Sequence, residues 1–148
     1  MMIFIHFIFS YLSTVAFGVL TNVPRRTLLA SGLTGSIGWM VFYFMREAGS
    51  SLGLANFVAA FLIGCGSILF SRLKKIPMLV FIVPSLVPLV PGGPAYLAVR
   101  EIVIGDGDRG LYYILVVAVT AGAIAGGFVL TTLVEKLVAR YQYSQIKS

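Results

Sequence analysis

Charged residues are absent from five long stretches of this 148-residue chain, and that absence limits what it can fold into. The uncharged stretches cover residues 1–24, 27–45, 48–71, 76–99 and 110–134. A helix needs about 20 mostly apolar residues to cross roughly 30 Å of hydrocarbon, and each stretch meets or approaches that length. The pattern predicts an all-α, polytopic membrane protein with about five transmembrane helices in a single domain over residues 1–148.

The expected helices follow these stretches. We expect helices over residues 3–20, 28–45, 52–70, 76–91 and 111–134, with a short additional helix over residues 94–104. No basic residue precedes the first apolar run, and no small-residue cleavage site of the signal-peptide kind follows it. We therefore interpret that run as a retained first helix.

The basic residues predict the direction of the crossings, because cytoplasmic loops carry the excess of Lys and Arg. One side would hold eight of them: Arg25, Arg26, Arg72, Lys74, Lys75, Lys136, Arg140 and Lys147. The other side would hold Arg46, Arg100 and Arg109, together with Glu47, Glu101, Asp106 and Asp108. We expect a multi-pass protein of the bacterial cytoplasmic membrane, with its N-terminus outside and its C-terminus in the cytoplasm.

The net charge of +6 does not indicate a nucleic-acid partner. A nucleic-acid binder gathers Lys and Arg on one accessible face, whereas here they lie at the ends of apolar segments. Charged residues make up only 11% of the chain, against roughly 25% in an ordinary soluble domain. The lipid bilayer is the expected surrounding, and nucleic acid is excluded as a partner.

Small residues recur at helical spacing and predict close helix packing, because they let backbones approach each other. The pairs are Ser31 with Gly35, Thr34 with Gly38 and Ala60 with Gly64, and a stripe of Ala118, Gly122 and Gly126 follows in the last segment. We predict that Gly35, Gly38, Gly64, Gly122 and Gly126 lie at helix contacts.

The fourth segment is broken by prolines, with Pro84, Pro88, Pro91 and Pro94 in eleven residues. An interior proline removes a backbone donor and clashes with the carbonyl four residues earlier. The carbonyls of Val80, Pro84 and Val87 are therefore expected to lose their normal helical bonds. Non-helical backbone at membrane depth persists only where protein covers it or where it lines a wet cavity.

The glycine pair that follows predicts a tight reversal, with Gly93 as the cap and Pro94 as the first residue of a new helix. Broken helices of this kind build substrate sites in transporters, where freed carbonyls face cations and a half-helix N-terminus faces anions. An amino acid carries both charges, so it would suit both ends of the break. A kinked helix without a ligand is the alternative interpretation.

Arg100 and Glu101 follow the break and have two possible roles. They are either boundary charges at the outer interface or a paired gate at the exit of the pathway. A charge at the bilayer centre costs about 3 kcal/mol, which places both near the surface. No metal, cofactor or enzymatic site is expected, because His6 and Cys65 have no second His or Cys and no intramembrane acid beside them. No phosphate-binding loop occurs either.

Two segments resemble a known family. Residues 21–39 (TNVPRRTLLASGLTGSIGW) and 83–99 (VPSLVPLVPGGPAYLAV) are similar to the small, C-terminal half of the threonine/serine exporter family. The residues that carry the resemblance are Asn22, Val23, Pro24 and Arg26, the Gly35–Gly38 turn, and Pro88, Pro91, Gly92 and Tyr96. The resemblance covers most of the chain.

The resemblance implies a subunit of a secondary exporter for threonine and serine, acting with a second, larger membrane subunit that resembles the family's N-terminal half. A dicarboxylate exporter of the succinate type and a non-transporting scaffold subunit are the alternatives. The candidate substrate pathway is Pro84, Pro88, Pro91, Gly92, Gly93, Tyr96, Arg100 and Glu101. Five crossings is an odd number, so a second five-helix unit fused ahead of this one would be inserted with the opposite orientation. Such inverted repeats are common in transporters.

Overall fold

The computed structural model of the chain is helical in every regular element of residues 2–146, and side chains are described for residues 2–137. Three long helices come first: α1 (Met2–Leu20), α2 (Arg25–Glu47) and α3 (Leu52–Lys74). The broken segment contains α4 (Leu79–Ser85), the 3-10 turn η1 (Val87–Leu89) and α5 (Gly92–Ile104). The last helix is α6 (Gly107–Ile146). Arg140 and Lys147 of the predicted cytoplasmic tail lie outside the described side chains.

Four helices are long and apolar enough to cross a membrane, namely α1, α2, α3 and residues Gly107–Leu137 of α6. The bent pair of Leu79–Leu89 and Gly92–Ile104 provides a fifth candidate span, with 53° between its two parts. The predicted class of polytopic helical membrane protein is therefore confirmed. The last helix runs further at both ends than the predicted residues 111–134.

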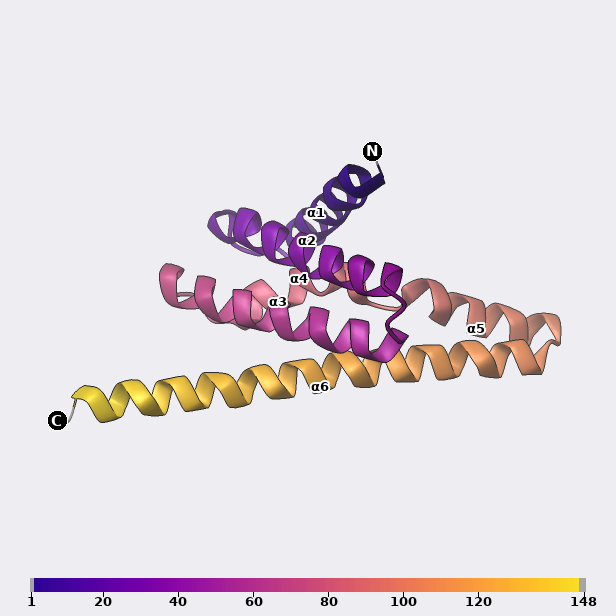
Figure 1. Cartoon of the computed structure of the whole chain (residues 1–148). Coiled ribbons are helices and arrows are strands. Elements are labelled where there is room, and N and C mark those ends of the chain that lie inside the picture. Colours follow the sequence, from indigo (N-terminus) through magenta and orange to yellow (C-terminus); the bar gives the residue numbers. More distant parts are fainter. Residues whose placement is uncertain (1, 147–148) are drawn as a thin grey trace.

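Helices α3 and α6 lie side by side and run in the same direction. Gly53 faces Val119 near one end, and Gly64 faces Thr131 further along both helices. The broken segment therefore returns the chain from the end of α3 to the level where α6 begins (Figure 1). The parallel direction of α3 and α6 favours one broken crossing over a re-entrant loop for the bent pair.

The interior of the bundle is rich in small and polar side chains, and many of its large apolar side chains face outward. Buried positions include Ser10, Thr14, Thr27, Ser31 and Ser36. Several of these hydroxyls donate to the carbonyl one turn earlier on their own helix, as Thr34 does to Ala30 at 2.8 Å. In a bilayer the hydrophobic effect does not drive helices together, so they associate through close packing. Small residues at the contacts and apolar residues toward lipid are therefore expected.

The predicted glycine contacts are present on α2 and α3. Gly35 lies against Thr14 and Ser85, Gly38 against Ile63, and Gly64 against Thr131. On α6, a Cβ placed at Gly122 would meet nothing within 4 Å in the described part of the chain, so a helix contact at Gly122 stays a prediction. Gly126 only touches the edge of the Phe57 ring, at 3.3 Å from its Cβ position.

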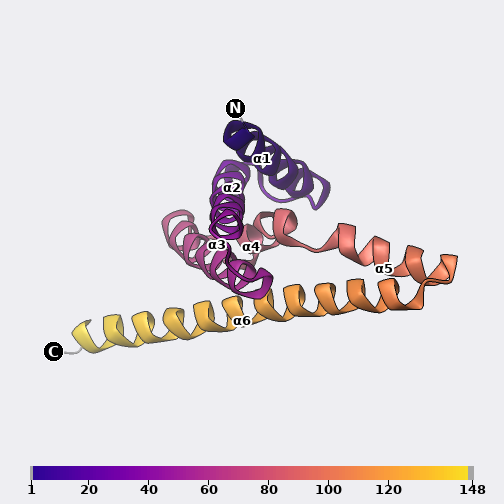
Figure 2. The same ribbon diagram turned by 45° about the vertical axis from the view of Figure 1, so that its right-hand side comes forward.

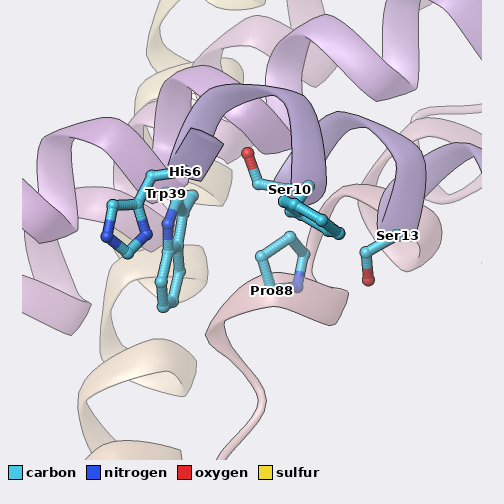
Figure 3. A pocket seen from close by; sticks show the side chains of 6 residues that line it. His6, Ser10, Ser13, Trp39 and Pro88 are labelled. Carbon is cyan, nitrogen blue, oxygen red and sulfur yellow. The ribbon is translucent and has the colours of Figure 1, made fainter. Parts of the chain in front are cut away.

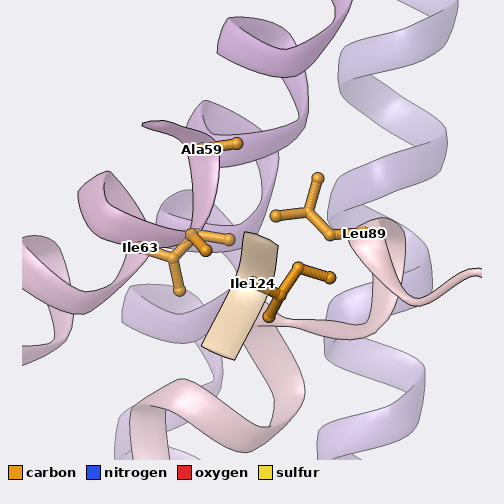
Figure 4. Close-up of a cluster of buried hydrophobic side chains, with 5 residues drawn as sticks. Ala59, Ile63, Leu89 and Ile124 are labelled. Carbon is orange, nitrogen blue, oxygen red and sulfur yellow. The ribbon is translucent and has the colours of Figure 1, made fainter. Parts of the chain in front are cut away.

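The face of α6 that packs on α3 is rotated from the predicted stripe. A Cβ at Gly127 would lie 2.6 Å from the Phe57 carbonyl oxygen, so the two backbones are in close approach there. Ile124 joins Ala59, Ile63 and Leu89 in a buried cluster where α3, η1 and α6 meet (Figure 4). This cluster holds the broken segment against the two parallel helices.

Helix α5 and the first part of α6 form a hairpin that extends past the α2–α3 connection (Figures 1 and 2). Because Gly53 faces Val119, the residues from Gly107 to Val119 lie beyond the start of α3. At 1.5 Å per residue this part of α6 spans about 18 Å. Its surface is strongly apolar, with Val99, Val103, Ile104, Leu111 and Tyr112 exposed.

Candidate functional site

The proline break has a different backbone from the one expected. Gly92 is the first residue of α5 and Pro91 is its N-cap, whereas Gly93 and Pro94 had been predicted for these roles. Neither Gly92 nor Gly93 has a positive φ. The reversal is made by Pro91, with φ −78° and ψ 53°, and the Gly92 N–H donates to the Val90 carbonyl at 2.8 Å. These values define an inverse γ-turn, which suits the fixed φ of proline.

The carbonyls next to the prolines are only partly released. The Val87 carbonyl, predicted to be free, accepts from the Val90 N–H at 3.3 Å in the 3-10 turn. At the start of α5, the Ala95 N–H donates to the Pro91 carbonyl at 3.0 Å, and Pro94 has no N–H. Gly93 therefore supplies the one first-turn N–H of α5 without a backbone partner among the described residues.

A cavity of about 270 Å³ lies beside the break, and we call it the break cavity. Its lining comes from α2, α3, the η1–α5 segment and α6, and consists of Trp39, Phe42, Leu52, Asn56, Pro88, Leu89, Val90, Pro91, Pro94, Val116 and Thr120. Asn56 and Thr120 are its hydrogen-bonding side chains apart from the Trp39 indole. Asn56 is 1% exposed, and its amide nitrogen donates to the Leu52 carbonyl at 2.9 Å.

A smaller cavity of about 190 Å³ also has Trp39 and Pro88 in its wall, and we call it the His6 cavity (Figure 3). It is lined by His6, Phe9, Ser10, Ser13, Trp39 and Pro88. Because the two cavities share Trp39 and Pro88, they are neighbours.

The predicted pathway residues do not all come together. Pro88 and Pro91 line the break cavity, and Pro84 is fully buried within α4. Gly92 and Gly93 face open space, and Tyr96 is 68% exposed on α5. None of the last three is part of the break cavity lining.

Arg100 and Glu101 also lie on α5, away from the break cavity lining. Their side chains approach to 3.7 Å, with the Arg100 side chain half exposed. The Glu101 side chain is more buried, at 13% exposed. Both residues lie on the extended hairpin, and their role as boundary charges or as a gate stays a prediction.

The Asn22, Pro24 and Arg26 motif connects α1 to α2 and packs beside the start of α4. Asn22 adopts a left-handed conformation with φ 55°. Asn22 and Pro24 line a groove of about 310 Å³ with Leu79, Val80 and Val83, and the Lys74 ammonium donates to the Arg26 carbonyl at 2.7 Å. The motif therefore lies at the opposite end of α4 from η1 and the break cavity.

Sequence reasoning missed Trp39, Asn56 and Thr120 as members of one site. Asn56 carried a usable signal, because it is an amide in the uncharged stretch 48–71 and polar groups inside a membrane segment are expensive. Thr120 carried no such signal in the sequence, because nothing distinguishes it there from the other threonines of α6, which face elsewhere.

Comparison with known proteins places the chain among transporters. Residues 6–134 match a family described as "Threonine/Serine exporter, ThrE". A protein of Mycobacterium tuberculosis (strain ATCC 25618 / H37Rv) described as "Probable threonine/serine exporter" is 30% identical over 120 residues. That match covers 80% of this chain but 23% of the relative. No solved structure matches the chain.

Proposed function

Because this chain belongs to the threonine/serine exporter family, we propose that it is one subunit of a secondary exporter for small hydroxy amino acids. The observation that carries the proposal is the break cavity, a small, mostly apolar space with Asn56 and Thr120 in its wall. Ligand sites are typically apolar spaces with a few well-placed polar groups. At about 270 Å³ the cavity suits a small ligand.

In this proposal the substrate's polar groups meet particular atoms of the break cavity. The Asn56 amide nitrogen is already bonded to the Leu52 carbonyl, so its amide oxygen is the acceptor for the substrate's ammonium group. The Thr120 hydroxyl would pair with the substrate hydroxyl. A site built to bond a hydroxyl rejects analogues without one, so this contact would select hydroxy amino acids.

A second membrane subunit is the proposed partner. The match covers less than a quarter of the relative, and we assign the remainder of a whole exporter to that partner. The α5–α6 hairpin offers a surface for that partner, because exposed apolar residues lie on the part that extends past the α2–α3 connection (Figure 2). With the basic residues inside, the hairpin points to the outer side of the membrane.

The test is efflux from cells that express this chain, the second subunit, both or neither. Cells preloaded with labelled threonine should release it faster only when both chains are present, and the two chains should purify together. Succinate and alanine serve as matched substrates, one without an ammonium group and one without a hydroxyl. Faster release of succinate but not threonine would reject the amino-acid assignment, and release of neither would indicate a scaffold subunit.

A further inference from the structure

The groove beside Asn22, which we call the Asn22 groove, shares no lining residue with the break cavity. Its volume is about 310 Å³, and its wall consists of Thr21, Asn22, Val23, Pro24, Leu79, Val80 and Val83. It lies at the end of the bundle where α3 finishes, opposite the α5–α6 hairpin (Figure 1). The groove is therefore a separate space between the α1–α2 connection and the first turns of α4.

Basic residues from two regions of the sequence lie next to the Asn22 groove. Arg25 directly follows the lining residue Pro24, and Lys75 lies four residues before the lining residue Leu79. The bond from the Lys74 ammonium to the Arg26 carbonyl joins the end of α3 to the start of α2. Five basic residues at this end of the bundle are exposed, namely Arg25, Arg26, Arg72, Lys74 and Lys75.

Acidic residues do not neutralise this end of the bundle. Glu47 ends α2 at the opposite end, and Glu101, Asp106 and Asp108 lie on the α5–α6 hairpin. Both ion pairs among the described side chains are also on that hairpin. The fifth acid, Glu135, lies on α6, which contributes nothing to the wall of the Asn22 groove. The groove therefore lies in a region of excess positive charge.

The wall of the Asn22 groove is apolar on the side that continues along the bundle. Leu79 and Val83 are both exposed on α4, and Val19 and Leu20 are exposed at the end of α1. In a membrane such outward apolar side chains contact acyl chains. A cationic end beside an apolar wall matches an amphiphile with an anionic head, whereas a free phosphate would leave the apolar wall unused.

We propose that the Asn22 groove binds the headgroup of an anionic phospholipid, with its phosphate near Arg25 and Lys75 and its acyl chains along Leu79 and Val83. The Asn22 side chain is exposed and makes no hydrogen bond to another described residue, so its amide is a donor for a headgroup oxygen. Basic pockets between helices on the cytoplasmic side are suited to anionic headgroups. In the proposed orientation this end faces the cytoplasmic leaflet, and the inference does not depend on what the protein exports.

The experiment follows thermal unfolding of the full chain in a non-ionic detergent while phosphatidylglycerol is added. A ligand that binds only the folded state raises the unfolding midpoint, so phosphatidylglycerol should raise it saturably. Two probes serve as controls: phosphatidylcholine with the same acyl chains, and glycerol phosphate, which has no acyl chains. Equal stabilisation by phosphatidylcholine would overturn the recognition of charge. Equal stabilisation by glycerol phosphate would indicate a site for free anions and would overturn the assignment to a lipid.

A charge variant tests the basic residues. Arg25→Gln combined with Lys75→Gln should weaken phosphatidylglycerol binding by at least about tenfold, because each basic residue near the membrane surface adds to the attraction. Arg46→Gln combined with Arg109→Gln is the matched control, since it removes the same charge from the opposite end of the bundle. The control should bind like the wild type. Equal losses in the two double variants would show a general effect of net charge and contradict a site at the groove.

A second variant tests the groove without any change of charge. Val83→Trp fills the Asn22 groove from an exposed position and should abolish the stabilisation by phosphatidylglycerol. Val129→Trp makes the same change at an exposed position of α6 and should leave the stabilisation intact. Full stabilisation of Val83→Trp by phosphatidylglycerol would overturn the inference, whatever the protein transports.

Discussion

The hydroxyl of Ser85 donates a 2.9 Å hydrogen bond to the backbone carbonyl of Ser31, joining α4 to α2 across 54 residues of sequence. Both residues are buried. The bond lies one residue after Pro84, so it anchors α4 at the point where the broken segment departs from helical geometry. The close contact of Gly35 with Ser85 and Thr14 supports the same junction.

Ser85→Ala should lower the free energy of unfolding in detergent by about 1 kcal/mol, because one buried hydrogen bond is lost and the Ser31 carbonyl remains. The measurement is denaturant-induced unfolding followed by circular dichroism. Ser50→Ala, in the connection between α2 and α3, is the matched control and should change stability by less. Equal effects from the two variants would mean that the Ser85 bond does not anchor α4.

Gly127→Ala should be destabilising, whereas Gly122→Ala should not affect the fold of this chain. A Cβ at residue 127 would lie 2.6 Å from the Phe57 carbonyl oxygen and 3.0 Å from the Ala60 Cβ, while residue 122 is open. Overpacking of this kind typically costs about 1–3 kcal/mol. Thermal unfolding of the two variants gives the comparison, and the reverse order of stability would contradict the described face of α6.

Gly92→Ala combined with Gly93→Ala should preserve both assembly and export. Neither glycine has a positive φ, and a Cβ at either position meets no atom within 4 Å. Alanine also favours the first turn of a helix by up to about 1 kcal/mol per residue over glycine. Efflux assays on the double variant test this, and loss of export with intact assembly would show that the glycine backbone itself contacts the substrate.

Thr120→Val should weaken the export of threonine, because it removes a hydroxyl from the break cavity while keeping the side-chain shape. We expect KM for threonine to rise about fivefold to tenfold, corresponding to one lost hydrogen bond. Thr132→Val is the matched control on the same helix, since Thr132 is exposed and bonds only to the Phe128 carbonyl. A similar KM in both variants would remove Thr120 from the site.

The orientation can be tested with single cysteines in a chain whose Cys65 is replaced. Gly107→Cys, at the exposed start of α6, should react with a membrane-impermeant reagent in intact cells. Lys74→Cys, at the end of α3, should react only after permeabilisation, because it lies on the side with the excess of basic residues. Labelling of position 74 in intact cells would reverse the topology.

Several features of this protein were determined by the sequence alone, because they depend on local chemistry. The uncharged stretches require helices with all backbone groups paired in lipid, and the run of prolines at residues 84, 88 and 91 must kink or break such a helix wherever it packs. The class of fold and the position of the break were therefore predictable. The glycine contacts on α2 and α3 were predictable too, because small residues recur there at helical spacing.

The tertiary structure decided which residues meet. Gly122 and Gly127 are both small, and only the rotation of α6 against α3 places residue 127 at the contact. Asn56 and Thr120 are 64 residues apart in sequence, and the parallel packing of their helices brings them to one cavity with Trp39 and Pro91. Helix rotation and register depend on the summed packing of many side chains, so no local pattern in the sequence contains them.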